Sequence, residues 1–129
     1  MILIAERDEA VRALQRFFLE RSNFAVEFVD DGLALLGRAS GARPQAIVTE
    51  ILLPKLDGLT ACRRLHEDPL TRDVPVIVFS VLAAGTRAAE AGAHAFLRKP
   101  LVESVFVAAI QAAIAAQPTN VKEQQWVPR

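Results

Sequence analysis

The stretch IVTEILLPKLDG, residues 47–58, joins an apolar run to an abrupt loop. The run ends at Glu50, and the loop contains Pro54 and the Asp57-Gly58 pair, which are typical turn residues. Apolar residues at helical spacing follow directly. The pattern therefore predicts a buried strand, a loop and a helix, with the carboxylate of Glu50 at the tip of the strand.

The same unit recurs along the chain. Short apolar runs are separated by longer amphipathic segments, and the runs over residues 2–5 and 76–79 lack polar alternation, which is typical of parallel strands covered on both faces. The runs are residues 2–5, 25–29, 46–49, 76–80 and 95–97. Helical spacing predicts the buried faces of the first and last helices at Val11, Leu14, Phe17 and Phe18 and at Val102, Phe106, Ile110 and Ile114. Because parallel strands need crossover helices, we expect an α/β doubly wound parallel sheet of five βα units.

The composition indicates one domain and excludes several classes of partner. A chain of 129 residues that is 52% hydrophobic can bury one core, and its 15 basic and 15 acidic residues create no field that favours nucleic acid or an anionic membrane. A single cysteine excludes an internal disulfide, no signal-peptide pattern opens the chain, and Glu103 and Gln111 interrupt the longest apolar stretch. We expect a cytoplasmic, soluble domain over residues 1–116, followed by a tail or linker start over residues 117–129.

Polar residues gather where the predicted strands end. In open α/β sheets, functional groups collect at the carboxyl ends of the strands, next to the point where the strand order reverses. The residues expected there are Glu6, Arg7 and Asp8 after the first strand, Glu50 after the third, Ser80 after the fourth and Lys99 after the fifth. The sequence therefore predicts one site built from four separated segments.

This set resembles the receiver domain of bacterial two-component response regulators, the CheY-like superfamily, over roughly residues 1–116. The resemblance implies a flavodoxin-like fold with strand order 2-1-3-4-5. In the family, an acidic pair after the first strand holds Mg²⁺, an aspartate after the third accepts phosphate, and the fourth and fifth strands supply Ser or Thr and a Lys-Pro pair. Ser80 and the pair Lys99-Pro100 match, and Phe96 matches an aromatic whose rotamer reports activation.

Two departures fall on the chemistry. Arg7 replaces the principal metal-binding aspartate, and Glu50 stands at the phosphoacceptor position, where its extra methylene moves the carboxylate by roughly 1 Å on ordinary bond lengths. In-line transfer tolerates such a displacement poorly. Because Glu6 and Glu50 face Arg7 and Lys99, the charges cancel, and we expect weak or no Mg²⁺ binding, no cofactor and no metal site. Asp8 is expected to be a solvated carboxylate near the start of the first helix.

These departures predict a degenerate receiver, or pseudo-receiver, that lacks the phosphoacceptor aspartate and is not an enzyme. We expect Glu50 to pair with Lys99 or Arg7, and the module to act without phosphorylation by contacting a protein, either a histidine kinase or a downstream output protein. Contact of Glu50 with Ser80 would mimic the phosphorylated state. Contact with Lys99 and Arg7 alone would resemble the inactive one.

The output face of the family also differs here. The segment between Ser80 and Lys99 is shorter than usual, which predicts a short fourth helix, and Phe96 and Val107 are expected on the switch and output face. The fifth helix has apolar residues off its buried stripe, at Val107, Ala108, Ala112 and Ala115. Two alternatives stay open: an Mg²⁺-dependent phosphoacceptor in a phosphorelay, using Glu50 or Asp57, and a scaffold or homodimerisation module that associates through the fifth helix.

Overall fold

Five short apolar segments form one parallel sheet in the computed structural model, which describes residues 1–116. The strand order is β2-β1-β3-β4-β5, so the predicted doubly wound, flavodoxin-like fold is confirmed. The strands are β1 (Ile2–Ala5), β2 (Val26–Val29), β3 (Ala46–Thr49), β4 (Val76–Ser80) and β5 (Ala95–Arg98).

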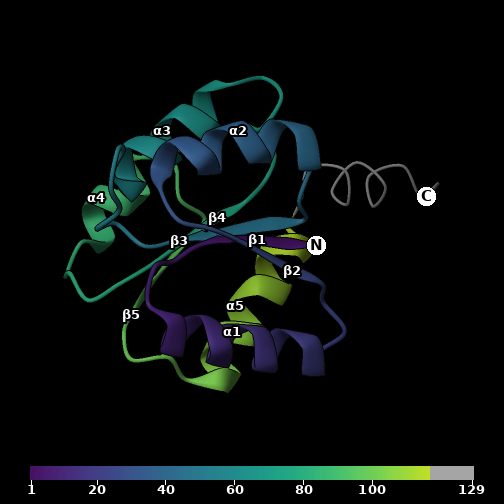
Figure 1. The fold of residues 1–129 in the computed structure, drawn as a ribbon. Coiled ribbons are helices and arrows are strands. Elements are labelled where there is room, and N and C mark those ends of the chain that lie inside the picture. Colours follow the sequence, from purple (N-terminus) through teal and green to yellow (C-terminus); the bar gives the residue numbers. More distant parts are fainter. Residues whose placement is uncertain (117–129) are drawn as a thin grey trace, which may run out of the picture.

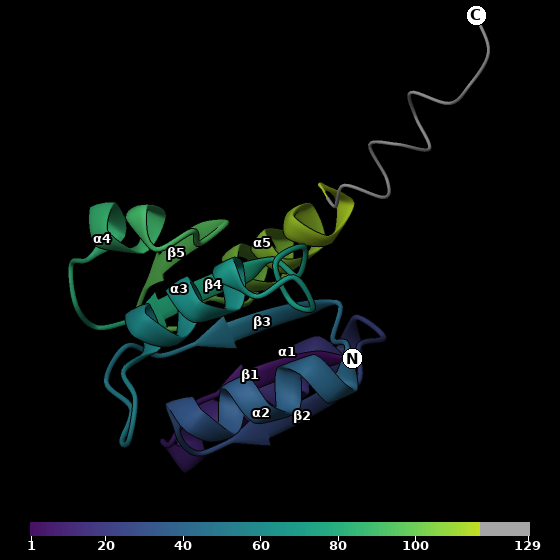
Figure 2. The same ribbon diagram turned by 90° about the horizontal axis from the view of Figure 1, so that it is seen from above.

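A helix follows each strand and covers one face of the sheet. The helices are α1 (Glu9–Arg21), α2 (Gly32–Ala42), α3 (Gly58–Glu67), α4 (Gly85–Glu90) and α5 (Glu103–Ala115). Figure 1 shows α1 and α5 on one face and α2, α3 and α4 on the other, and Figure 2 shows the same layers from above. With six residues, α4 is short, as the sequence predicts. None of the helices within residues 1–116 has the length and apolarity needed to cross a membrane.

The alternation of side chains along the strands divides the core between the two faces. Ile2 and Ile4 of β1 pack in the cluster beneath α1 and α5, whereas Leu3 and Ala5 pack in the cluster beneath α2 and α3. All four side chains are buried. This two-sided burial explains why the sequence of β1 shows no polar alternation.

The buried face of α1 differs from the prediction. Leu14 and Phe17 are 47% and 54% exposed, whereas Gln15 and Leu19 are fully buried. The prediction was wrong for Leu14 and Phe17, whereas Val11 packs against the core cluster and Phe18 is half-buried. It considered only apolar residues for the buried face and so left out Gln15. Here the inward position one turn before Leu19 carries the amide of Gln15, which shifts the buried face by one residue.

Two predicted positions on α5 also need correction. Val102 is 50% exposed because it is the N-cap of α5 and lies before the helical turns that pack on the sheet. Val107, expected on the exposed output face, is half-buried and packs against the core cluster that contains Phe106 and Ile110. A helix position next to a buried one lies about 100° around the axis, which on α5 still falls within the packed side.

Candidate functional site

The carboxyl ends of β1, β3, β4 and β5 bring four polar side chains together, as predicted. Ala5 pairs with Thr49 in the sheet, so Glu6 and Glu50 follow at the same level of two neighbouring strands. Ser80 closes β4, and Lys99 follows β5, with its backbone N–H donating to the Ser80 carbonyl at 2.9 Å. Register alone therefore places these four residues at one edge of the sheet.

The ammonium group of Lys99 lies between two buried carboxylates. Its Nζ is 3.0 Å from Oε1 of Glu6 and 3.0 Å from Oε2 of Glu50. Glu6 is only 3% exposed and Glu50 only 6% exposed. Two carboxylates and one ammonium give this buried group a net charge of one negative unit. Both carboxylates share the ammonium of Lys99 as their cationic partner.

The second oxygen of Glu50 is held by neutral donors. Its Oε1 accepts hydrogen bonds from Ser80 Oγ and from the backbone N–H groups of Ile51, at 2.8 Å, and Leu52, at 3.2 Å. Both carboxylate oxygens are thus occupied, one by a cation and the other by three hydrogen-bond donors. The arrangement stabilises the ionised form in a fixed position.

The pKa values of this pair shift in opposite directions. Burial alone would raise the pKa of Glu50, but the hydrogen bonds from Ser80, Lys99 and the Leu52 backbone bring it below its ordinary value. Burial alone would lower the pKa of Lys99, but its interactions with Glu50 and Glu6 raise it. Glu50 and Lys99 are therefore both charged at neutral pH.

The loop after β3 returns to Glu50 and holds its backbone. Gly58 N–H donates to the Ile51 carbonyl at 2.8 Å, and a Cβ at position 58 would collide with the carbonyl oxygen of Glu50. Thr49 Oγ1, which is buried, donates to that same carbonyl oxygen at 2.9 Å. The glycine of the Asp57-Gly58 pair is thus required by this close approach, and it fixes the position from which the Glu50 side chain starts.

Arg7 does not join this group, and its predicted place in the pocket is wrong. Its side chain is exposed, and within the described part of the chain it forms no hydrogen bond or ion pair. The cation that pairs with Glu50 is Lys99. The physical reason is that a guanidinium loses hydration when it enters a site in which one ammonium already serves both carboxylates.

The carboxylates of Asp8 and Asp57 cap helices. Oδ1 of Asp8 accepts from Ala10 N at 2.9 Å and from Val11 N at 3.1 Å, which places it at the N-terminus of α1. Asp57 caps α3 in the same way and also accepts from the Thr60 hydroxyl, and these hydrogen bonds outweigh burial and lower its pKa. Asp8 is therefore an exposed capping residue, as expected, and lies outside the buried group.

Phe96, the other predicted switch residue, is half-buried. It packs against the cluster of Ile51, Leu59, Val78, Ala84 and Ala88, beside α4. A Cβ added at Gly85 would lie 3.7 Å from its ring. The ring therefore rests against the first turn of α4.

Two features of the site were missed from the sequence. The backbone donors of Ile51 and Leu52 leave no signal, because any residue can supply an N–H group. Arg12 was also missed: its guanidinium donates to the carbonyl oxygens of Glu6 and, at 2.9 Å, Val29, and so ties the ends of β1 and β2 together. The available signal was its position, one helical turn after the capping residue Asp8.

The donors present do not fit a magnesium shell. Mg²⁺ requires near-octahedral oxygen coordination. Oε1 of Glu6 and Oε2 of Glu50 face an ammonium group, and Asp8 is engaged in capping. Within residues 1–116, no group of three or more His, Cys, Asp or Glu side chains is arranged to hold a metal ion.

Two curated proteins are similar to this chain over most of its length. The chain is 35% identical over 116 residues to the transcriptional regulatory protein CseB of Streptomyces coelicolor, a match that covers 88% of this chain and 48% of CseB. It is 32% identical over 114 residues to the response regulator MprA of a Mycobacterium species, covering 86% of this chain and 49% of MprA. The chain spans about half the length of these curated relatives.

Solved structures and the family model agree. A response regulator from Chloroflexus aurantiacus J-10-fl matches with a TM-score of 0.84 and 27% identity, covering 88% of this chain and 96% of that one. The receiver domain of sensor histidine kinase PA1611 from Pseudomonas aeruginosa PAO1, solved with a magnesium ion in its active-site cleft, matches with a TM-score of 0.81 and 26% identity, covering 89% and 97%. The family model of the response regulator receiver domain matches residues 2–111. The chain therefore belongs to the response regulator receiver domain family.

Proposed function

We propose that this receiver domain signals through protein contact without being phosphorylated, and that the carboxylate of Glu50 takes the place of a switchable phosphoryl group. The observation that carries the proposal is the set of partners around Glu50. One oxygen pairs with Lys99 and the other accepts from Ser80, two residues that match motif positions of the family. A carboxylate held on both sides is a poor nucleophile, because attack on phosphorus would require it to leave these partners.

The same contacts favour an active-like conformation over an inactive-like one. Glu50 reaches Ser80 and Lys99 together, whereas Arg7 makes no contact with it. Phe96 packs inward against the cluster beside α4. We infer that Glu50 holds Ser80 and Lys99 permanently in positions that other receivers reach only on phosphorylation.

Weak or absent Mg²⁺ binding belongs to this proposal. The ammonium of Lys99 lies 3.0 Å from a carboxylate oxygen of Glu6 and 3.0 Å from one of Glu50. A divalent cation would have to displace this ammonium to reach the two carboxylates. Arg7, at the position that the resemblance assigns to a metal ligand, brings no oxygen donor. We propose that the module works as a binding domain and not as an enzyme, in the cytoplasm, with a histidine kinase or an output protein as its partner.

The test is a titration with Mg²⁺, with and without beryllofluoride as a phosphoryl mimic, followed by amide chemical shifts. The wild type is compared with a double variant, Glu50→Asp with Arg7→Asp, which supplies the carboxylates that the family uses. A matched control combines Glu50→Asp with Arg63→Asp, which makes the same charge change at an exposed position of α3. We expect the wild type and the control to stay silent and the double variant to respond at Ser80, Phe96 and Lys99.

The same spectra test the active-like conformation. Without additives, the wild-type shifts of Ser80, Phe96 and Lys99 should resemble those of the double variant with beryllofluoride bound. A wild-type spectrum that matches the untreated double variant would contradict the active-like state. A wild-type response to Mg²⁺ and beryllofluoride would instead favour the phosphoacceptor alternative, and the proposal would fail.

A further inference from the structure

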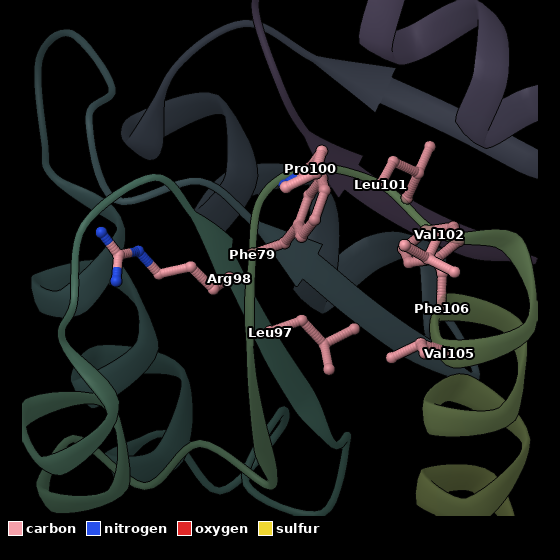
Figure 3. Close-up of a pocket in the computed structure, with 8 residues that line it drawn as sticks. All are labelled: Phe79, Leu97, Arg98, Pro100, Leu101, Val102, Val105 and Phe106. Carbon is pink, nitrogen blue, oxygen red and sulfur yellow. The ribbon is translucent and has the colours of Figure 1, made fainter.

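A pocket lies between β5 and the start of α5, and its lining includes Phe79, whose ring centroid is 5.4 Å from Nζ of Lys99. Its volume is about 260 Å³, and Figure 3 shows Leu97 of β5 and Val105 of α5 on facing sides of it. Apart from Arg98, whose side chain points to the other side of β5, its lining is apolar. The lining residues are Phe79, Leu97, Arg98, Pro100, Leu101, Val102, Val105 and Phe106. An apolar pocket of this size can take one aromatic side chain.

The outer face of α5 continues from the pocket toward the end of the helix as an uncharged surface. Val105, at the pocket, is 52% exposed, and Ala108, Gln111 and Ala112 are exposed along the same side. After Glu103 the helix carries no charged residue. An exposed helix face that carries apolar and uncharged residues next to an apolar pocket can mark an interface, so this face is suited to a covering segment.

The length of chain beyond the described residues allows that segment to come from the protein itself. Ala116, at the end of α5, is followed by QPTNVKEQQWVPR, in which Trp126 is the tenth residue. On the helical rise of 1.5 Å per residue, Ala116 and Val102 are about 20 Å apart. Ten residues of extended chain span up to about 33 Å, so Trp126 can reach back to the pocket with length to spare.

We propose that residues 117–129 dock back along the exposed, uncharged side of α5 formed by Val105, Ala108, Gln111 and Ala112, and that Trp126 fills the pocket beside Leu97 and Val105. The small alanines allow a chain to approach the helix closely. The indole buries a large apolar surface at a single point, which gives the segment its anchor. A protein partner that binds this face has to displace the segment.

Trp126 is also the probe for this proposal. The chain has one tryptophan and no tyrosine, so its tryptophan fluorescence reports this segment alone. In the full chain we expect a blue-shifted emission and protection from acrylamide. Val105→Lys, which places a charge at a half-exposed wall of the pocket, should shift the emission to the red and raise the quenching constant to that of free N-acetyltryptophanamide.

The matched control is His94→Lys. His94 is exposed and lines a different pocket, which also contains Ala116, so the same charge is placed near the start of the segment but away from the proposed site. It should leave the emission and the quenching unchanged. Ala108→Glu, on the exposed side of α5, is a second variant on the proposed path and should act like Val105→Lys, while far-ultraviolet circular dichroism checks that each variant is folded.

Three results would overturn the proposal. In the first, Trp126 of the wild type is quenched as readily as free N-acetyltryptophanamide. In the second, the emission and quenching of Trp126 change with His94→Lys and not with Val105→Lys. In the third, protection would disappear on dilution, which would assign the pocket to the segment of a second copy. The emission wavelength, the acrylamide quenching and the effect of dilution do not depend on whether Glu50 accepts a phosphoryl group. They therefore test this proposal separately from the proposed function.

Discussion

Lys99 is the residue on which the electrostatics of the site depend. Its ammonium is 3.0 Å from carboxylate oxygens of both Glu6 and Glu50. Removing one partner of a buried ion pair is far more costly than removing the whole pair, because a charge is left in a poorly solvated place. Loss of Lys99 would leave two such charges.

We predict that Lys99→Met lowers the free energy of unfolding by roughly 3–5 kcal/mol, the range typical of an unpaired buried charge. Arg7→Met, which removes an exposed cation one residue after Glu6, should change it by less than about 0.5 kcal/mol. Urea denaturation of both variants measures the difference. Equal effects would mean that Arg7 shares the role of Lys99.

The ionisation of Glu50 gives a second prediction. Because the pKa of Glu50 in the folded protein lies below its ordinary value of 4.5, its ionised form stabilises the fold at pH values above 4.5. That stabilisation is lost as the pH falls through the folded-state pKa. The wild type should therefore be more stable than Glu50→Gln at neutral pH, and the difference should shrink in acid. Urea denaturation of both proteins as a function of pH checks this, and a difference that does not change with pH would contradict it.

At the scale of single residues, part of the site was predictable from the sequence. Glu50, Ser80 and Lys99 follow apolar runs, so parallel pairing brings their side chains to one edge. The direction of Arg7 was not predictable, because it depends on competition between hydration and a site already occupied by Lys99. The backbone donors at Ile51 and Leu52 depend on loop geometry, which residue types do not encode.

At the scale of elements, α4 is the shortest of the helices within residues 1–116. It has six residues, begins with Gly85 and has no side-chain cap at its N-terminus. A methyl group at Gly85 would lie 3.7 Å from the ring of Phe96, an ordinary van der Waals contact. Helix propensity and packing therefore both favour alanine there.

Gly85→Ala is expected to raise the free energy of unfolding by about 0.5–1 kcal/mol, through lower entropy of the unfolded chain and the contact with Phe96. The control is Gly92→Ala, just after α4. Gly92 has a φ of +95°, and a Cβ there would lie 2.7 Å from Cγ of His66. That variant should lose stability. Thermal unfolding distinguishes the two, and destabilisation by Gly85→Ala would show that α4 requires the glycine.

The elements were easier to predict from the sequence than their faces. Strands buried on both sides have a plain apolar pattern, and crossover helices fill the intervals. The buried face of α1 was harder to predict, because Gln15 occupies a buried position and Phe17 an exposed one. A pattern that sorts residues by polarity alone cannot identify a buried amide.

At the scale of the whole molecule, the fold has the layout of a receiver domain. The strand order is that of the receiver fold, and the family model matches residues 2–111. The carboxylate of Glu50, which our proposal places at the acceptor position, is bound on both sides by the protein itself. The proposal therefore separates the receiver architecture from the phosphorylation that drives it elsewhere.

The most direct measurement is the intact mass of the wild-type chain after incubation with acetyl phosphate and Mg²⁺, alongside the double variant Glu50→Asp with Arg7→Asp. We predict that the wild type gains no phosphoryl group, because Glu50 stays paired with Lys99 and Ser80, and that the double variant gains one. A wild-type chain that gains the mass of one phosphoryl group, lost again in Glu50→Gln, would show that Glu50 is an acceptor and contradict phosphorylation-independent signalling.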